Sequence, residues 1–216
     1  WQKPDHLGVW GPQTEAQAIR IHGFGTHQIH LMGTPRFDIY FSAREKPPPS
    51  PYSFPYGLYV GSAMPFDDIG TLKRIDQLIA VSEAFSSDFR VVYRPHPWQQ
   101  RRNTDPTFRS EEFSRVVLDT QFEEAFRQGL KPGQTDLGFQ PSLAYYPGLL
   151  RGSQFVIGPL TTMLFEAALC LRPLVALSYF DSYHANTTKR YFSHFEGMEQ
   201  IPGFTFVENE QSLNES

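Results

Sequence analysis

The chain has 216 residues, of which 40% are hydrophobic and 15% aromatic, enough apolar material for a sizeable core. Its formal charge is −4, with no Lys/Arg-rich run, which argues against nucleic acid as a partner. A single cysteine, Cys170, excludes an internal disulfide framework and any multi-cysteine metal site. No apolar run approaches the roughly 20 residues that cross a bilayer, and no signal-peptide pattern opens the chain. We therefore expect a soluble, cytoplasmic protein, and a start at Trp1 rather than Met indicates a fragment.

The front of the chain differs in composition from the rest. Residues 1–46 contain two short β-type segments, "HLGVWG" and "HQIHLMG", and then the turn "GTPRFD". The next stretch is rich in proline, which favours an extended linker over a helix. We therefore predict a remnant of a preceding domain at 1–46, a linker at 47–57 and one domain at 58–216.

From residue 58 onwards, strands and helices are predicted to alternate. Apolar strands are predicted at 58–63, 89–94, 115–119, 154–158 and 173–179. Helices are predicted at 71–85 with Thr71 as cap, at 121–129 behind a Thr120/Glu123 capping box, at 142–152 and at 161–171. Strands without polar alternation, each followed by a helix, predict a Rossmann-like α/β domain with helices on both faces of a parallel sheet.

Polar residues follow the predicted strands at their carboxyl ends, where ligands bind in open parallel sheets. One rim should therefore carry Gly61 and Ser62, Arg94 and His96, Asp119, the segment Gly158 to Thr162, and Asp181 with Tyr183 and His184. The last three side chains could line a sugar pocket.

Thr161 and Thr162 stand at a predicted helix start, where free N–H groups and the helix dipole favour an anion. Glu166 lies about one turn deeper on the same face, among apolar residues, so its carboxylate needs a partner. The diol of a ribose that lies beside a bound phosphate would be a suitable hydrogen-bonding partner for this carboxylate. The alternative is that the threonines only cap the helix and Glu166 faces solvent.

Other polar residues have simpler interpretations. His27 and His30 should face opposite sides of a strand, which argues against a metal site with His22. Asp67 and Asp68 precede a helix and are more simply read as stabilising its N-terminus. Tyr145 or Tyr146 could stack on a base. No G-x-S-x-G elbow supports acyl transfer.

The order of three motifs resembles a known enzyme group. "YVGS", "YRPHP" and "YPGLLRGSQFVIGPLTTMLFEAALCLRPLVAL" resemble the donor-binding half of glycosyltransferases with the two-Rossmann-domain GT-B architecture. The similarity is strongest to bacterial surface-carbohydrate enzymes: Kdo transferases, HP-motif sialyltransferases and polyglycerol-phosphate polymerases. It covers roughly residues 55 to 207. The "G-x-P-R-x-D" turn resembles the end of the N-terminal half of such enzymes.

The resemblance implies roles for individual residues. His96 and Pro97 match the HP motif, which contacts the donor's phosphate, and His96 would stabilise the leaving group. Thr161 and Thr162 match the paired hydroxyl motif, which binds the same phosphate. A hydrogen-bonding group fixed between two prolines offsets the charge on a departing phosphate without reorganising. The alternative is that Arg94 pairs with an acidic neighbour and His96 is a turn residue.

Further matches concern the rest of the donor site. Glu166 matches the glutamate of the "E-A-A/L-x-x-G-x-P" motif, which is expected to hold the ribose of the donor. In this sequence Arg172 stands where a glycine usually precedes the proline of that motif. Gly61 and Ser62 match the glycine-bearing first loop, where the backbone can approach the ligand.

The resemblance implies a nucleotide-sugar-dependent glycosyltransferase of capsule or lipopolysaccharide biosynthesis. It implies no cofactor and no metal, a CMP-linked donor in preference to UDP or CDP, and a glycan or lipid-linked acceptor. The catalytic base would come from the N-terminal half, and peripheral membrane association through parts beyond this chain stays open. The alternatives are a nucleotide-sugar epimerase of related fold and a non-catalytic nucleotide- or glycan-binding scaffold.

Overall fold

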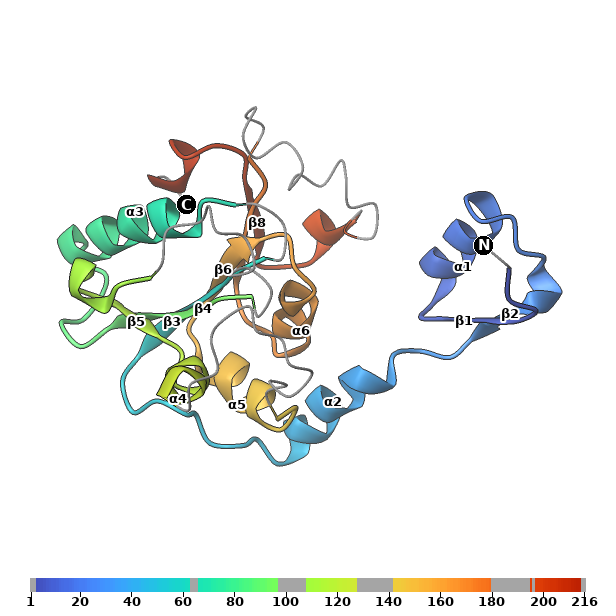
Figure 1. The fold of residues 1–216 in the computed structure, drawn as a ribbon, viewed down its shortest axis with the longest axis horizontal. Helices are drawn as coiled ribbons and strands as arrows, with labels where there is room; N and C mark the ends of the chain where they lie inside the picture. The colour runs from blue at the N-terminus through green and yellow to red at the C-terminus, as the bar shows by residue number, and fades with distance from the viewer. Residues whose placement is uncertain are drawn as a thin grey trace.

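The computed structural model describes residues 3–62, 66–96, 108–127, 142–179, 195 and 197–214. They form a sheet domain and a smaller N-terminal unit, which are joined by the segment that contains helix α2 (Asp38–Glu45) (Figure 1). Among these residues, no helix is both long enough and apolar enough to cross a membrane.

The sheet domain is built on six parallel strands in the order β5-β4-β3-β6-β7-β8. Their bounds are β3 Tyr56–Val60, β4 Arg90–Arg94, β5 Val116–Leu118, β6 Val156–Pro159, β7 Leu174–Leu177 and β8 Phe204–Val207. Every residue of β3 and of β6 is buried, because both faces of the sheet are covered. The predicted Rossmann-like α/β fold is confirmed.

Helices pack on both faces of this sheet (Figure 1). Leu58 and Val60 of β3 share one core with α5 (Tyr145–Gly152), α6 (Met163–Leu169) and Tyr40 of α2. Tyr59, which points to the other face, packs with α3 (Asp68–Val81). Since successive strand residues alternate between the faces, one apolar strand supplies both cores.

Two predicted helix caps were wrong, because an aspartate caps each helix earlier in the chain. Asp67 caps α3 by accepting a hydrogen bond from the N–H of Gly70 at 2.9 Å, whereas Thr71 lies buried inside the helix. Asp119 precedes α4 (Thr120–Arg127) and accepts from the N–H of Gln121 at 2.9 Å. An aspartate side chain satisfies the first free N–H groups as well as threonine does, and its charge suits the helix dipole.

The N-terminal unit is a small βαβ arrangement. Strands β1 (Leu7–Val9) and β2 (Ile29–Leu31) pair in parallel, and α1 (Pro12–Arg20) connects them. Its own core contains Val9, Ala18, Phe24 and Ile29. Helix α2 falls within the predicted 1–46 remnant, yet its Tyr40 belongs to the core of the sheet domain.

Candidate functional site

The order of the strands defines a switch point between β3 and β6. From β3 the chain continues to β4 and β5 on one side, and it then returns to β6, β7 and β8 on the other. In open parallel sheets, ligands bind at the carboxyl ends of the strands where this reversal occurs. Gly61 and Ser62 follow β3, and Leu160 to Thr162 follow β6, so these residues flank the switch point.

Gly61 and Gly158, which the sequence analysis placed on the ligand-binding rim, shape the backbone at the switch point. A Cβ on Gly158 would lie 2.1 Å from the carbonyl oxygen of Val60, so β6 can approach β3 this closely only with glycine. The N–H of Gly61 donates to the carbonyl of Arg94 at 2.9 Å, which extends the contact between β3 and β4 past the strand end. Ser62, which follows, is buried.

Thr161 and Thr162 stand directly before α6. The carbonyls of Thr161 and Thr162 accept hydrogen bonds from the N–H groups of Leu164 at 3.0 Å and Phe165 at 3.1 Å. Thr162 occupies the N-cap position, but its side chain makes no capping hydrogen bond, and it is exposed. The hydroxyl of Thr162 is therefore not used as a helix cap, which was one of the two interpretations of the sequence.

Glu166 is fully buried, so the alternative in which it faces solvent is wrong. Arg36 Nη2 donates to Glu166 Oε1 at 3.1 Å, and the hydroxyl of Tyr40 donates to Oε2. Burial raises the pKa of the Glu166 carboxyl, while the hydrogen bond from Tyr40 and the charge of Arg36 oppose that rise. Both partners come from the crossover before the sheet domain. The only sequence signal for these contacts was the "GTPRFD" turn, which contains Arg36.

Arg94 is buried and forms an ion pair with Asp119, its acidic neighbour at the end of the adjacent strand. Nη1 donates to Asp119 Oδ2 at 2.6 Å, and Nη2 donates to the hydroxyl of Tyr146 at 3.0 Å. The guanidinium also lies over the rings of Tyr146 and Phe122, 4.7 and 5.2 Å from their centroids. Of the two interpretations given to Arg94, the structure shows the acidic pairing.

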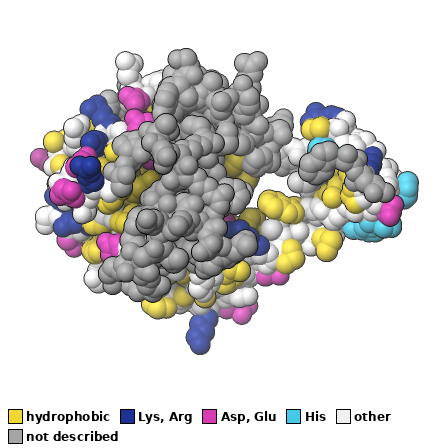
Figure 2. All heavy atoms as spheres, viewed as in Figure 1, with side chains coloured by type: hydrophobic (Ala, Val, Ile, Leu, Met, Phe, Trp, Pro, Cys, Tyr) yellow, Lys and Arg dark blue, Asp and Glu magenta, His cyan; other side chains and the backbone are white. Residues whose placement is uncertain are grey.

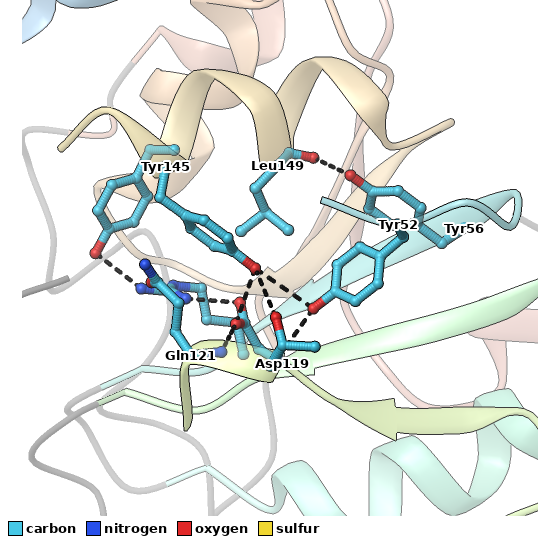
Figure 3. A network of polar contacts seen from close by, with 9 residues as sticks. Tyr52, Tyr56, Asp119, Gln121, Tyr145 and Leu149 are labelled. Carbon is cyan, nitrogen blue, oxygen red and sulfur yellow. Dashed lines mark hydrogen bonds and ion pairs between the residues drawn. The ribbon is translucent and has the colours of Figure 1, made fainter. Parts of the chain in front are cut away.

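The same aspartate organises a network of tyrosines (Figure 3). Tyr145 donates from its hydroxyl to Asp119 Oδ1 at 3.1 Å. The hydroxyl of Tyr52, from the predicted linker, accepts from the N–H of Thr120 at 3.1 Å. Tyr145 therefore points towards Asp119 and Tyr52 (Figure 3). Tyr146 is buried and accepts a hydrogen bond from Arg94, so both tyrosines are engaged inside the protein.

His96 follows β4 after Pro95 and is half-buried. Burial lowers the pKa of its imidazole below the ordinary value near 6.5, so the ring is mainly neutral at pH 7. A neutral imidazole can still donate one hydrogen bond. Pro97, Asp181, Tyr183 and His184, which the sequence analysis placed on the same rim, lie outside the described residues.

The N-terminal histidines form a pair. His30 Nε2 lies 3.0 Å from His6 Nδ1, and the two rings are 5.1 Å apart. In the described part of the chain, no group of three or more His, Cys, Asp or Glu side chains could hold a metal ion.

A cavity of about 660 Å³ lies between the N-terminal unit and the start of α6. It is lined by residues 7–14, Gln17, Ala18, His22, Phe37, Thr162 and Phe165. Thr162, which follows β6 at the switch point, therefore also belongs to the lining of this cavity. The cavity is of the size that small-molecule sites have, about 300 to 1,000 Å³.

Neither a protein-family model nor a curated protein matches this sequence. Among solved structures, the chain is similar to the UDP-GlcNAc 2-epimerase of Methanocaldococcus jannaschii, solved in complex with UDP-GlcNAc and UDP. The TM-score is 0.56 at 14% identity, over 98% of this chain and 52% of the epimerase chain.

It is also similar to the wall teichoic acid polymerase TagF, solved after a soak with CDPG, with a TM-score of 0.52 at 15% identity. That match covers 98% of this chain and 46% of TagF. The chain thus spans about half the length of each protein. At these identities the likeness shows the fold, a Rossmann-like α/β domain.

Proposed function

We propose that this chain is the nucleotide-sugar-binding half of a GT-B glycosyltransferase. The observation that carries the proposal is the switch point between β3 and β6, flanked by Gly61 and Ser62 on one side and Thr161 and Thr162 on the other. The two similar structures, which were solved with a nucleotide sugar and with CDPG, support a nucleotide-linked ligand.

In this proposal, the donor's phosphate binds at the start of α6. The hydroxyls of Thr161 and Thr162 donate to its oxygens, and the backbone at Gly61 allows close approach. His96, in the loop that follows the neighbouring strand β4, donates a hydrogen bond to the same phosphate. Arg94 supports this group from behind, because its ion pair with Asp119 fixes the strand end from which His96 projects.

The proposed reaction is group transfer to a hydroxyl. The acceptor oxygen forms a bond to the anomeric carbon of the donor sugar, and the bond from that carbon to the nucleotide phosphate breaks. The phosphate leaves with the electron pair, and His96 with the two threonines stabilises the charge that develops on it. We assign the base that takes the acceptor proton to the other half of a two-domain enzyme.

The finer identity of the ligands is also part of the proposal. We favour a CMP-linked sugar over UDP- and CDP-linked sugars, a glycan or lipid-linked acceptor, and a role in capsule or lipopolysaccharide assembly in the cytoplasm. These choices rest on the HP motif and the paired threonines of the sequence, His96 with Pro97 and Thr161 with Thr162.

A second candidate is a nucleotide-sugar epimerase, because the similar epimerase structure has the same fold over 98% of this chain. Transfer joins the sugar to an acceptor and releases nucleotide, whereas epimerisation changes the sugar without an acceptor. Product analysis with the full-length protein, in the presence and absence of acceptor, separates the two reactions.

The first experiment is calorimetric titration of the chain with CMP, CDP and UDP. We expect one nucleotide to bind, and Thr161→Ala/Thr162→Ala and His96→Ala each to weaken it about tenfold, which is about 1.4 kcal/mol. Thr205→Ala is the matched control, since Thr205 is an exposed threonine on β8. If no nucleotide binds to the chain or to the full-length protein, the chain is a scaffold and the proposal is wrong.

A further inference from the structure

The cavity between the N-terminal unit and α6 is lined by residues that carry no permanent charge. Among the described residues that line it, none is Asp, Glu, Lys or Arg, and His22 is its one titratable side chain. Arg36 precedes the lining residue Phe37, but its charge is paired with Glu166. A ligand with a phosphate or a carboxylate would therefore lose its hydration here without gaining an ion pair from a lysine or an arginine.

Aromatic rings form one wall of this cavity. Trp10, at the carboxyl end of β1, is 53% exposed although it lies against Phe37, with ring centroids 5.9 Å apart at 63°. Phe165 of α6 also lines the cavity, and its ring stacks on Phe195 with centroids 5.0 Å apart. Figure 2 shows apolar side chains gathered where the two parts of the molecule meet. A half-exposed indole in a concave site offers a flat apolar surface to a ligand.

Polar side chains also line the cavity. Thr14 is already engaged, because its hydroxyl donates to the carbonyl of Gly11 at 2.9 Å and accepts from the N–H of the same residue. Gln17, one turn further along α1, brings a carboxamide that can both donate and accept. Thr162 brings a hydroxyl from α6. The cavity therefore pairs a flat apolar face with neutral hydrogen-bonding groups around it.

From this lining we infer that the cavity binds a neutral carbohydrate, with a sugar ring stacked on Trp10 and one of its hydroxyls bonded to Gln17. A second sugar hydroxyl donates to the oxygen of Thr162, whose own O–H remains available to the donor phosphate. A pyranose ring matches this surface, since its C–H groups form an apolar face and its hydroxyls project from the edge. The inference builds on the proposed function and assigns the acceptor of the transfer to the class of uncharged glycans. An acceptor held here would lie beside Thr162, where the proposed donor phosphate binds.

Saturation-transfer NMR tests the inference on the 216-residue chain with neutral disaccharides, lactose, cellobiose and chitobiose, and with carboxylate-bearing comparators, sialyllactose and cellobiouronic acid, which lack the phosphate that the proposed donor site would bind. We expect at least one neutral sugar to bind more tightly than both charged ones. Trp10→Ala should weaken the binding of that sugar at least about tenfold. Trp10→Phe should weaken the binding less, because phenylalanine keeps an aromatic face. Gln17→Ala should also weaken it, since an amide partner is lost.

Phe41→Ala is the matched control, because Phe41 is an aromatic ring of similar exposure, 49%, on α2 outside the cavity lining. The inference is overturned if charged sugars bind better, if no neutral sugar binds, or if Trp10→Ala leaves sugar binding unchanged. It is also overturned if Trp10→Ala weakens the binding of nucleotide and leaves the binding of sugar unchanged. Nucleotide binding without sugar binding contradicts this inference alone, whereas sugar binding without nucleotide binding contradicts only the proposed function.

Discussion

Arg94 Nη1 lies 2.6 Å from Asp119 Oδ2, and both side chains are buried, with exposures of 3% and 0%. The pair joins the carboxyl ends of β4 and β5, directly before the loop that carries His96. Burying two charges costs hydration free energy, which additional hydrogen bonds must offset. Tyr146 supplies one to Arg94, and Tyr145 and the N–H of Gln121 supply two to Asp119.

Removing the cation alone should destabilise the protein strongly. We expect Arg94→Met to lower the free energy of unfolding by about 3–5 kcal/mol, because the carboxylate of Asp119 stays buried without its partner. In Arg94→Met/Asp119→Asn, the asparagine is uncharged and still caps α4, so much of that loss should return. Urea denaturation of the wild type and the variants measures this. A double variant as unstable as Arg94→Met would show that the ion pair is not the cause.

Glu166 should tolerate glutamine better than alanine. Burial raises the pKa of its carboxyl, so a neutral side chain of the same shape suits the site, and glutamine still offers an acceptor to Tyr40. Alanine leaves the hydroxyl of Tyr40 without that acceptor, which we expect to cost about 1–3 kcal/mol more than glutamine does. Denaturant midpoints compare the two variants at equal slope. Equal losses would mean that the contact with Tyr40 contributes little.

The thiol of Cys170 should react slowly in the native protein. Its side chain is buried, and burial raises its pKa to about 11, so little thiolate exists at pH 8. We expect a colourimetric thiol reagent to label the chain fast in denaturant and only slowly without it. Fast labelling under native conditions would show that this part of α6 opens readily.

The imidazole of His96 should make the protein less stable in mild acid. Because burial lowers its pKa in the folded state, the unfolded chain takes up this proton at a higher pH than the folded chain does. The free energy of unfolding should therefore fall as the pH drops through about 6.5, where the unfolded histidine titrates.

His96→Gln isolates this effect from other titrating groups. The variant should lose less stability than the wild type between pH 8 and pH 5, measured by urea denaturation at each pH. Parallel losses in the two proteins would assign the pH dependence to other groups.

The sequence predicted those parts of the fold that a local pattern specifies. A strand was predicted at 58–63 from its apolar residues, and the structure has it at Tyr56–Val60, where every residue is buried as in a strand covered on both faces. The strand therefore begins two residues earlier than predicted, inside the predicted linker. Strand β8, Phe204–Val207, was not predicted, because three of its four residues remain partly or fully exposed. Helix α1 was missed for a similar reason, since Ala18 is its one buried residue.

The candidate site was harder to predict, because its polar contacts join distant parts of the chain. Arg36 and Glu166 are 130 positions apart, and no local pattern reports such a pair. Arg94 shows a different difficulty. A cation at the end of a strand looks the same in the sequence whether it binds a ligand or the carboxylate of the next strand. The register between β4 and β5 places Asp119 beside Arg94, and the two form an ion pair.

The reversal of strand order at β3 also determines how the sheet can assemble. Strand β3 can pair with β4 as soon as both exist, whereas β6 becomes available only after β4, β5, α4 and α5. Pairing between segments this far apart requires closure of a long loop, which slows folding. Until β6 docks, β3 has an open apolar edge, the feature that promotes aggregation of nascent chains. A nascent chain that stalls before β6 would expose the most buried strand of the sheet.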